Sequence, residues 1–240
     1  MVRQRMEYGR TAGLVTTAEA IQTALEHVQY VLLDFDGPVC DIYAGLSAPT
    51  VAGQLSKMLT AAGVDLPDHV LTQDDPLEVF RYSAVLGTEV NRALQEALTD
   101  LEVKATATAE ITPGVEEMIR RAVEVGKPIA IVSNNSVASI TAFLSARGLL
   151  SAVSYISGRT DPNPALMKPN PYLVSQALDK LTAPSEQTML VGDSLSDIEA
   201  AKAAGVISVG YANKPGKADS FASAGAEVVV TRLDDLVPAL

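Results

Sequence analysis

Short apolar runs alternate with amphipathic helical segments over the second half of the chain. The runs predict β-strands at 128–133, 153–157, 188–193, 206–210 and 227–230. The segments between them predict helices at 136–147, 171–181 and 195–204. Strands that alternate with helices favour right-handed crossovers, which place parallel strands in one sheet with helices on both faces. The pattern therefore predicts an α/β fold.

The first part of the chain contributes one further strand. An apolar run predicts it at 30–35, after a helix that starts at a capping box of Thr16 and Glu19 and ends near Gln29. Residues 1 to about 15 carry no periodic pattern, and we expect them to be poorly ordered.

Between the first strand and the alternating series lies a long segment with helical periodicity only, residues 46–110. The next helix is expected to begin at Thr112, with Pro113 in its first turn. We therefore predict a core domain of 1–45 and 111–240 and an inserted, all-helical cap domain of 46–110. The insertion leaves the first strand at its carboxyl end, the edge where open α/β sheets bind ligands.

The composition limits the possible partners. The chain carries 18 Lys and Arg against 29 Asp and Glu, and a net charge of −11 argues against a nucleic-acid polymer or an anionic membrane. No apolar run approaches the roughly 20 residues that span a bilayer, and the N-terminus lacks the apolar segment of a signal peptide. The single cysteine, Cys40, excludes an intramolecular disulfide. We expect a cytoplasmic protein, and the sequence carries no signal of its oligomeric state.

Polar side chains gather where the predicted strands end. The carboxyl ends of parallel strands share one edge of the sheet, so residues far apart in sequence converge there. The set comprises carboxylates, a hydroxyl, an amide and a lysine: Asp34, Asp36, Ser133, Asn134, Lys168, Asp193 and Asp197. Taken alone, the first acidic pair also fits an acidic turn closed by Gly37 and Pro38, and the other strand ends decide between the two interpretations.

This set of groups is suited to phosphoryl transfer. Carboxylate oxygens bind Mg²⁺, a hard cation that prefers oxygen ligands. The cation and a lysine neutralise the phosphate so that an aspartate can approach phosphorus, while Ser133 and backbone N–H groups hydrogen-bond the phosphoryl oxygens. Uncatalysed hydrolysis of a phosphate monoester needs up to ~10²¹-fold acceleration, so several groups must act together.

The motifs and their order resemble the haloacid dehalogenase (HAD) superfamily, which consists mostly of phosphatases. Its four motifs are matched in order by Asp34-Phe35-Asp36-Gly37, by Ser133, by Lys168, and by Asp193 with Asp197. The resemblance covers residues 30 to about 210, and Pro38 departs from the usual Thr or Val. It implies a Rossmann-like, three-layer α/β/α core, and the helical insertion is similar to the cap of phosphoglycolate-phosphatase-like members.

The resemblance also implies roles for the motif residues. Asp34 would be the nucleophile that forms an aspartyl-phosphate, and Asp36 would protonate the leaving oxygen and then activate water. Mg²⁺ would be held by the Asp34 side chain, the Asp36 backbone carbonyl and Asp193. The function implied is a Mg²⁺-dependent phosphatase acting on a small phosphorylated metabolite.

The remaining motif residues would assist these groups. Ser133, Asn134 and Lys168 would bind the phosphate, and Gly37 would support the first motif. Asp197 is expected to orient Lys168 or a metal-bound water rather than bind the ion. A phosphomutase of the same fold is the alternative, and a non-catalytic HAD-like binding protein is a further one.

Three other interpretations of the motifs fail on spacing or length. A calcium EF-hand loop would need an acidic or amide residue at Pro38 and a glycine at Val39. The stretch GDSLS at 192–196 equals the nucleophile block of GDSL-type esterases, but that family needs a histidine near its C-terminus. Here both histidines, His27 and His69, lie far upstream, and we expect His69 to be a solvated loop residue. A phospho-accepting receiver module is about half this length and lacks the insertion.

The helical insertion is expected to determine the substrate. Arg81, Tyr82 and Arg92 are candidates to meet its anionic end, although arginine is common on helix surfaces. Asp41 and Tyr43 fit the entrance of the site and ordinary packing equally well. Phosphoglycolate, a sugar phosphate and a nucleotide monophosphate all remain open as substrates.

Overall fold

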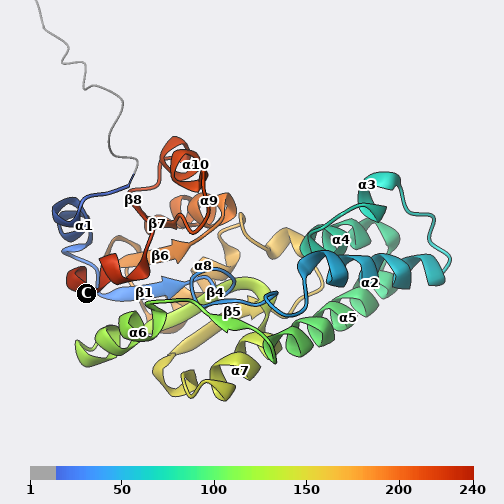
Figure 1. Ribbon diagram of the computed structural model, residues 1–240, viewed down its shortest axis with the longest axis horizontal. Coiled ribbons are helices and arrows are strands. Elements are labelled where there is room, and N and C mark those ends of the chain that lie inside the picture. The colour runs from blue at the N-terminus through green and yellow to red at the C-terminus, as the bar shows by residue number, and fades with distance from the viewer. Residues whose placement is uncertain (1–14) are drawn as a thin grey trace, which may run out of the picture.

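The structure is a computed structural model that describes residues 15–240 (Figure 1). The expectation of poor order for the N-terminus falls, up to residue 14, outside the described residues. The core is a parallel six-stranded sheet in the order β5-β4-β1-β6-β7-β8. Its strands are β1 (Tyr30–Leu33), β4 (Ile129–Ser136), β5 (Tyr155–Arg159), β6 (Thr188–Gly192), β7 (Ile207–Tyr211) and β8 (Val228–Val230). The predicted α/β fold is confirmed.

Helices cover both faces of the sheet (Figure 1). One face carries α1 (Ala18–Leu25), α6 (Val115–Glu124), α7 (Val137–Ala146) and the 3-10 helix η5 (Leu233–Ala239). The other face carries α8 (Tyr172–Leu181), α9 (Leu195–Ala204) and α10 (Lys217–Ala224). Short 3-10 helices lie in the connections: η2 (Leu150–Ala152), η3 (Pro164–Leu166) and η4 (Ser185–Gln187).

The central strand β1 shows why its sequence is an unbroken apolar run. Val31 and Leu33 point into the cluster beneath α1 and α6, whereas Leu32 points into the cluster beneath α8 and α9. Successive side chains of a strand face opposite sides of the sheet, and both sides are buried here. In register, Leu33 lies beside Ile131 of β4 and Val191 of β6, so the carboxyl ends of these three strands meet.

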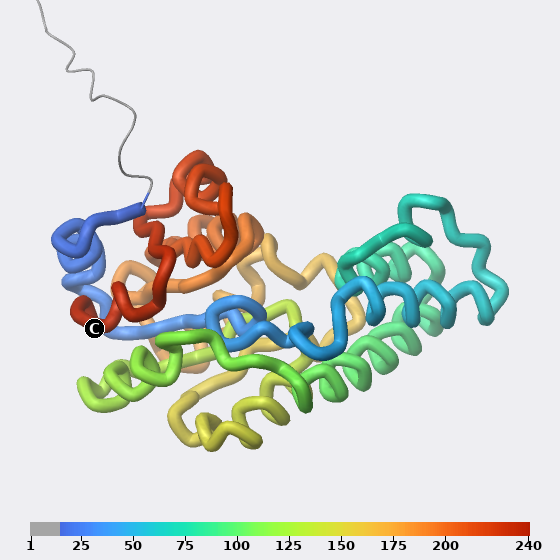
Figure 2. Tube along the Cα trace, in the orientation of Figure 1, coloured from blue at the N-terminus to red at the C-terminus, as the bar shows by residue number. Residues whose placement is uncertain are grey.

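The helical insertion extends from this carboxyl edge of the sheet (Figure 2). It contains α2 (Ala48–Ala61), α3 (Asp68–Leu71), α4 (Pro76–Ser83), η1 (Ala84–Leu86) and α5 (Thr88–Thr106). These helices enclose their own apolar cluster, which includes Leu55, Phe80 and Leu94 and also Met167 from the connection between β5 and α8. The insertion therefore packs on itself and on the connection that carries Lys168.

A two-stranded antiparallel ladder joins the insertion to the core, and the sequence pattern did not predict it. It pairs β2 (Cys40–Asp41) with β3 (Glu110–Ile111). The expectation of helices alone up to residue 110 is wrong at this last position. A strand of two residues has no measurable periodicity, and its pairing with a partner far along the chain fixes it instead.

Two predicted helix starts are also wrong. The N-cap of α1 is Thr17, whose side chain accepts from Ala20 N–H at 3.3 Å, while Thr16 pairs with Val229 at the sheet edge. Helix α1 ends at Leu25 rather than near Gln29. Helix α6 begins after Gly114, because Thr112 donates its hydroxyl to the Gly37 carbonyl instead of capping the helix.

Two elements of the core extend beyond the pattern. Strand β4 continues through Ser133 to Ser136, with a break in its pairing to β5 between Val132 and Ser136. Helix α10 was not predicted, since its short apolar face amounts to little more than the buried Phe221. Among residues 15–240, no helix is both long and apolar enough to cross a membrane.

Candidate active site

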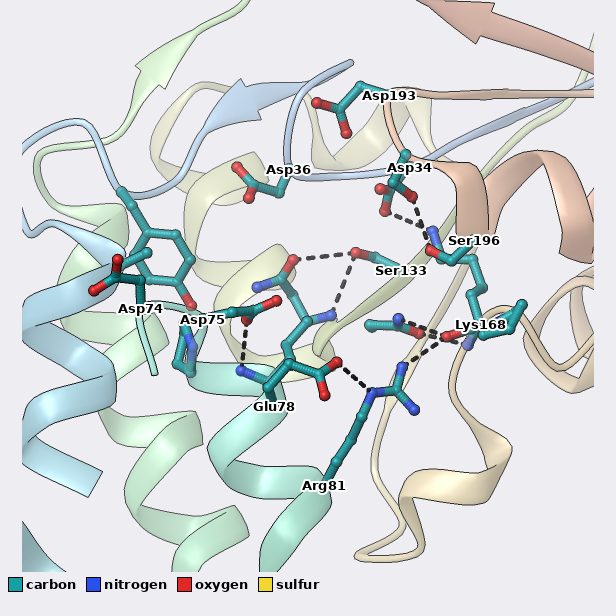
Figure 3. Close-up of a pocket in the computed structure, with 18 of the residues that line it drawn as sticks. Asp34, Asp36, Asp74, Asp75, Glu78, Arg81, Ser133, Lys168, Asp193 and Ser196 are labelled. Atoms are coloured by element: carbon teal, nitrogen blue, oxygen red, sulfur yellow. Dashed lines mark hydrogen bonds and ion pairs between the residues drawn. The ribbon is translucent and has the colours of Figure 1, made fainter. Parts of the chain in front are cut away.

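The polar strand-end residues line a cavity of about 650 Å³ between the sheet edge and the helical insertion (Figure 3). Asp34, Asp36 and Asp193 lie on one side of it, and Lys168 lies next to Asp34. Of the seven residues predicted from the strand ends, six line this cavity, and Asp197 lies behind Lys168. The structure therefore brings the whole predicted set together.

Asp34 follows directly on β1 and is only 8% exposed. Its Oδ1 accepts from the backbone N–H of Phe35 at 2.8 Å and lies 2.8 Å from the ammonium group of Lys168. Burial, followed by repulsion from Asp197, raises the pKa of Asp34 to about 7, although Lys168 opposes the rise. The Asp34 carboxyl group therefore changes protonation near neutral pH.

Lys168 is fully engaged by the protein. Its ammonium group contacts Asp197 Oδ1 at 2.5 Å, Asp34 Oδ1 at 2.8 Å and the Val132 carbonyl at 2.8 Å, so its three hydrogens have three acceptors. Burial alone would lower the pKa of Lys168, but the Asp197 and Asp34 carboxylates outweigh burial and raise it. Lys168 therefore remains a cation beside Asp34.

Asn134 fixes the backbone on which Lys168 is carried. Its Oδ1 accepts from Lys168 N–H at 2.8 Å, and its Nδ2 donates to the Lys168 carbonyl at 3.2 Å. The side-chain amide predicted to meet the substrate is thus occupied by the Lys168 main chain. Ser133 Oγ donates to Asn135 Oδ1 at 3.2 Å and faces the cavity.

Asp193 is held by groups that the sequence motifs do not include. Lys217 Nζ lies 2.6 Å from both Asp193 Oδ2 and the Asp193 carbonyl, and Asn213 Nδ2 donates to Oδ2 at 3.0 Å. On its other side Asp193 packs against Gly37, where a Cβ would lie 2.3 Å from the Asp193 Cγ. Gly37 also has a φ of 101°, so both the close approach of Asp193 and the backbone conformation require glycine at this position.

Asp197 is a structural partner of Lys168 and of helix α9. Its Oδ1 accepts from Lys168, and its Oδ2 accepts from the backbone N–H and the hydroxyl of Ser194, which completes a capping box. Both oxygens of Asp197 are thus committed, as expected of a residue that orients Lys168.

Asp36 stands across the cavity from Lys168 and accepts from Ile42 N–H at 3.1 Å. Burial raises the pKa of Asp36 to about 7, the Ile42 hydrogen bond opposes the rise, and the Asp193 and Asp34 carboxylates add to it. A carboxyl group with such a pKa can both donate and accept a proton at neutral pH. The loop that carries it is tied to the core through Thr112, which donates to the Gly37 carbonyl at 2.5 Å.

The donor set fits a divalent cation. One oxygen from each of Asp34, Asp193 and Asp197 lies within 4.8 Å of the others. Because Asp197 is committed, Asp34 and Asp193 are the two that retain a carboxylate oxygen without a partner among residues 15–240. Hard cations prefer oxygen donors of this kind.

The insertion contributes a second wall to the cavity, made of Gln73, Asp74, Asp75, Glu78 and Arg81 with their neighbours. Of the cap residues that the sequence singled out, Arg81 lines the cavity, but Tyr82 and Arg92 are absent from its lining. His69 is exposed as expected but lies in the short helix α3, with its ring against Tyr82.

Tyr43 and Asp41 each line a cavity at the site. Tyr43 lines the main cavity, and Asp41 lines an adjoining one of about 330 Å³. Tyr43 also packs against the apolar clusters of the core and of the insertion, so both interpretations still fit it.

A buried ion pair behind the phosphate side of the cavity was also missed by the sequence analysis. Glu102 of α5 and Arg159 of β5 are 0% and 4% exposed, and Arg159 Nη2 lies 2.8 Å from Glu102 Oε1. Glu102 accepts from Ser136 N–H and Asn135 Nδ2, while Arg159 donates to the Asn134 carbonyl. The pair therefore connects the insertion's last helix to the segment that carries Ser133.

For Lys217 and Asn213 a usable signal did exist. Both follow β7, whose carboxyl end lies at the same edge of the sheet as that of β6. The argument that gathered the other strand ends applies to this loop as well. Glu102 and Arg159 carried no such signal, since a charged residue on a helix is normally solvated.

Comparison with known proteins agrees with this geometry. A profile of the family described as haloacid dehalogenase-like hydrolase matches residues 31–211. This chain belongs to that family. The haloacid dehalogenase-like region includes all seven strand-end residues and ends before Asn213 and Lys217.

Two curated relatives of this haloacid dehalogenase-like chain are phosphoglycolate phosphatases. The protein of Yersinia pseudotuberculosis is 26% identical over 218 residues, which cover 89% of this chain and 93% of the relative. The protein of Neisseria gonorrhoeae is 27% identical over 212 residues, which cover 79% and 82%. The predicted kinship to phosphoglycolate-phosphatase-like members is confirmed.

Solved structures confirm the haloacid dehalogenase-like fold. A predicted phosphatase from Clostridium acetobutylicum has a TM-score of 0.67 at 18% identity and covers 88% of this chain and 97% of its own. CbbY from Rhodobacter sphaeroides, in complex with phosphate, has a TM-score of 0.61 at 20% identity and covers 87% and 96%.

Proposed function

We propose that this protein is a Mg²⁺-dependent phosphatase that hydrolyses a small phosphorylated metabolite through an aspartyl-phosphate on Asp34. The observation that carries the proposal is that Asp34, Asp193 and Lys168 meet at one edge of the sheet. Lys168 Nζ lies 2.8 Å from Asp34 Oδ1, and carboxylate oxygens of Asp34 and Asp193 lie within 4.8 Å of each other. Its family supports a hydrolase, and its curated relatives support a phosphatase.

The proposed roles follow from the contacts of each residue. Lys168 and the Phe35 N–H orient the Asp34 carboxylate, one oxygen of which attacks phosphorus and displaces the alcohol to form the acyl phosphate. Asp36, with its pKa near 7, gives a proton to the leaving oxygen and then takes one from water. Ser133 donates to a phosphoryl oxygen, and Asn134 contributes by fixing Lys168.

Asp34, Asp193 and the backbone carbonyl of Asp36 would hold Mg²⁺, and when bound the ion would supply positive charge against the phosphate. The choice of Mg²⁺ among divalent cations rests on the all-oxygen donor set. Asn213 keeps the Asp193 carboxylate oriented for this purpose, while Lys217 pairs with the same carboxylate oxygen.

The same proposal assigns residues 1–45 and 111–240 to a core domain and residues 46–110 to a cap domain. The separate apolar cluster of α2–α5 and the β2–β3 ladder at the junction support this division. A cytoplasmic location is part of the proposal.

A phosphate-release assay tests the activity. We expect the protein with Mg²⁺ to release one inorganic phosphate per ester consumed from small alkyl and aryl phosphates, and excess chelator to abolish release. A mutase would instead return the phosphoryl group to a second hydroxyl. Asp34→Asn should be inactive with every ester, since an amide is a poor nucleophile. Full activity of this variant would contradict the proposal.

The Asp36→Asn variant distinguishes the role of Asp36 from that of Asp34. The phenolate of an aryl phosphate with an acidic leaving group departs without being protonated. This variant should therefore release a burst of phenolate about equal to the enzyme present, followed by a slow phase in which the aspartyl-phosphate is hydrolysed. An alkyl phosphate, whose leaving group needs the proton, should give no burst. Equal loss of both esters, without a burst, would remove Asp36 from the acid/base role.

A further inference from the structure

The wall of the cavity that faces the catalytic carboxylates is itself acidic. Asp74, Asp75 and Glu78 come from the segment that starts helix α4, and they lie opposite Asp34 and Asp36 (Figure 3). Ser133 and Lys168 line the cavity beside Asp34, so the alcohol part of a phosphate ester bound at Asp34 would extend toward this wall. The charge of the wall therefore acts on the leaving group.

The one cation of this wall, Arg81, is already bonded through all three of its nitrogens. Its Nε lies 3.1 Å from Glu78 Oε1, its Nη2 donates to the Lys168 carbonyl at 2.8 Å, and its Nη1 donates to the Pro164 carbonyl at 3.5 Å. Lys168, the other cation that lines the cavity, has three acceptors of its own. Arg81 and Lys168 are the only two cations among the described residues that line the cavity, and each is paired with a carboxylate of the protein.

Several oxygen atoms of the wall, in contrast, have no hydrogen-bond partner among the described residues and can accept from a substrate. No hydrogen bond or ion pair engages the Asp74 carboxylate among the described residues, and Asp75 uses Oδ1 alone, for the N–H of Leu77. The buried Tyr43 Oη also lines the cavity without a partner in the described chain. Burial raises the pKa of Tyr43, so this group is a neutral phenol whose oxygen can accept a hydrogen bond.

We propose that the preferred substrate is a phosphate monoester whose alcohol carries an ammonium group, and that the wall of Asp74, Asp75 and Glu78 disfavours an alcohol that carries a carboxylate. This inference rests on the proposed phosphatase function. It separates the chain from the relatives named for phosphoglycolate, an ester with a carboxylate two atoms from the ester oxygen. Like charges brought together in a half-enclosed site are a strong device for rejecting a ligand.

Three esters of nearly equal size test the proposal: 2-aminoethyl, 2-hydroxyethyl and carboxymethyl phosphate. We expect kcat/KM to fall in that order, by several-fold at the first step and at least ten-fold at the second. The differences should shrink in high salt, because Asp74, Asp75 and Glu78 are exposed and their charges are screened.

Glu78→Gln tests the wall directly. The substitution removes one negative charge and releases Arg81 Nε, so the preference for aminoethyl over carboxymethyl phosphate should fall by at least ten-fold. Asp74→Asn should change the same ratio in the same direction by several-fold. Glu96→Gln is the matched control, because Glu96 is an exposed glutamate on helix α5 of the insertion that does not line the cavity. Its ratio should equal that of the wild type.

The outcomes distinguish this inference from the function on which it rests. A wild-type protein that hydrolyses all three esters and prefers carboxymethyl phosphate overturns the inference and leaves the phosphatase intact. An unchanged ratio in both Glu78→Gln and Asp74→Asn overturns it as well. If neither these esters nor an activated aryl phosphate releases phosphate, the proposed function itself fails.

Discussion

Asp34 and Asp36 are two carboxyl groups whose pKa values rise to about 7, in each case first through burial. Their ordinary value is 3.8, so the folded chain binds protons that the unfolded chain releases between about pH 4 and pH 7. A group of this kind stabilises the fold fully below the lower value, and its contribution is lost as pH rises through the higher one. The two acids therefore make the metal-free fold sensitive to pH.

We expect the urea midpoint of the metal-free protein to fall as pH rises from 5 to 7.5, with a loss of more than about 1 kcal/mol of unfolding free energy. In the Asp36→Asn variant the side chain at this position cannot ionise, so its urea midpoint should fall less over the same pH range. Saturating Mg²⁺ should reverse the fall, because the cation favours the ionised carboxylates. A midpoint that rises over the same interval would contradict the raised pKa values.

Lys217 is a cation that already contacts the carboxylate proposed to bind the metal. Lys217→Met should tighten Mg²⁺ binding by roughly ten-fold, because a positive charge beside Asp193 is removed while Asn213 still holds the carboxylate. The metal-free variant should lose about 1 kcal/mol of stability with its ion pair. Calorimetric titration and urea unfolding measure the two effects.

Lys214→Met is the control for Lys217→Met. Lys214 belongs to the same loop and carries the same charge, but no ion pair to Asp193 is present among the described residues. Its metal affinity should change by less than about two-fold. Weaker Mg²⁺ binding by Lys217→Met would show that orientation of Asp193 outweighs charge.

The residues that the sequence identified share one property. Asp34, Lys168 and Asp193 each stand at the end of a buried apolar run or at the start of a helix, so a periodic pattern points to them. Arg159 acts through contacts to Glu102 and the Asn134 carbonyl made across the fold, and no local pattern encodes such contacts. Lys217 does follow a strand end, but only the folded chain brings it to Asp193. Spacing along the chain therefore located the catalytic groups and missed the groups that hold them.

At the scale of elements, the same distinction separates the helices that the pattern located from those it did not. Helix α9 runs over the predicted residues Leu195–Ala204, since its Ser194 cap and apolar face are local features. Strands β2 and β3 and the start of α6 depend on distant partners, as the bond from Thr112 to Gly37 shows. Elements whose position is fixed by tertiary contacts have no periodic pattern in the local sequence that would predict them.

The Glu102–Arg159 pair joins α5 to β4 and β5, and we expect it to position the phosphate segment as well as to stabilise the fold. Glu102→Gln leaves the Arg159 charge buried and unpaired, which should cost about 3–5 kcal/mol of unfolding free energy. Inorganic phosphate should also inhibit this variant more weakly, because Ser136 N–H loses its charged acceptor.

The double variant Glu102→Met with Arg159→Met separates the two roles. An apolar pair should recover most of the stability but not the affinity for phosphate. Recovery of both would make the pair purely structural. Glu117→Gln, in an exposed ion pair with Arg120, is the matched control and should change stability by less than about 1 kcal/mol.

At the scale of the whole molecule, the helical insertion extends from the carboxyl edge of the sheet (Figure 1) and forms one wall of the cavity (Figure 3). Closure by such a layer excludes water from the phosphoryl site and limits the size of the substrate. The sequence predicted the insertion from its helical periodicity, whereas the acidic wall depends on how α4 is oriented over the sheet, which periodicity does not specify.

We expect phosphoproteins to be poor substrates. Capped phosphoserine, as its N-acetyl methylamide, should be hydrolysed with a kcat/KM roughly 100-fold higher than the same phosphoserine within a folded protein, because only the small ester fits beneath the insertion. Phosphate release from the two compounds measures the ratio. Equal rates would show that the insertion does not restrict access.

The insertion and the connection that carries Lys168 are fastened to each other. Met167 is buried in the apolar cluster of α2–α5, and Arg81 donates to the Lys168 carbonyl. A movement that lifts the insertion must therefore either break this fastening or carry the lysine away from Asp34. In the second case the open molecule differs from the closed one at its nucleophile as well as at its entrance, because Lys168 contacts Asp34. Substrate entry and phosphoryl transfer would then take place in different positions of the insertion. The nucleophile would be aligned by Lys168 only while the insertion keeps bulk water out.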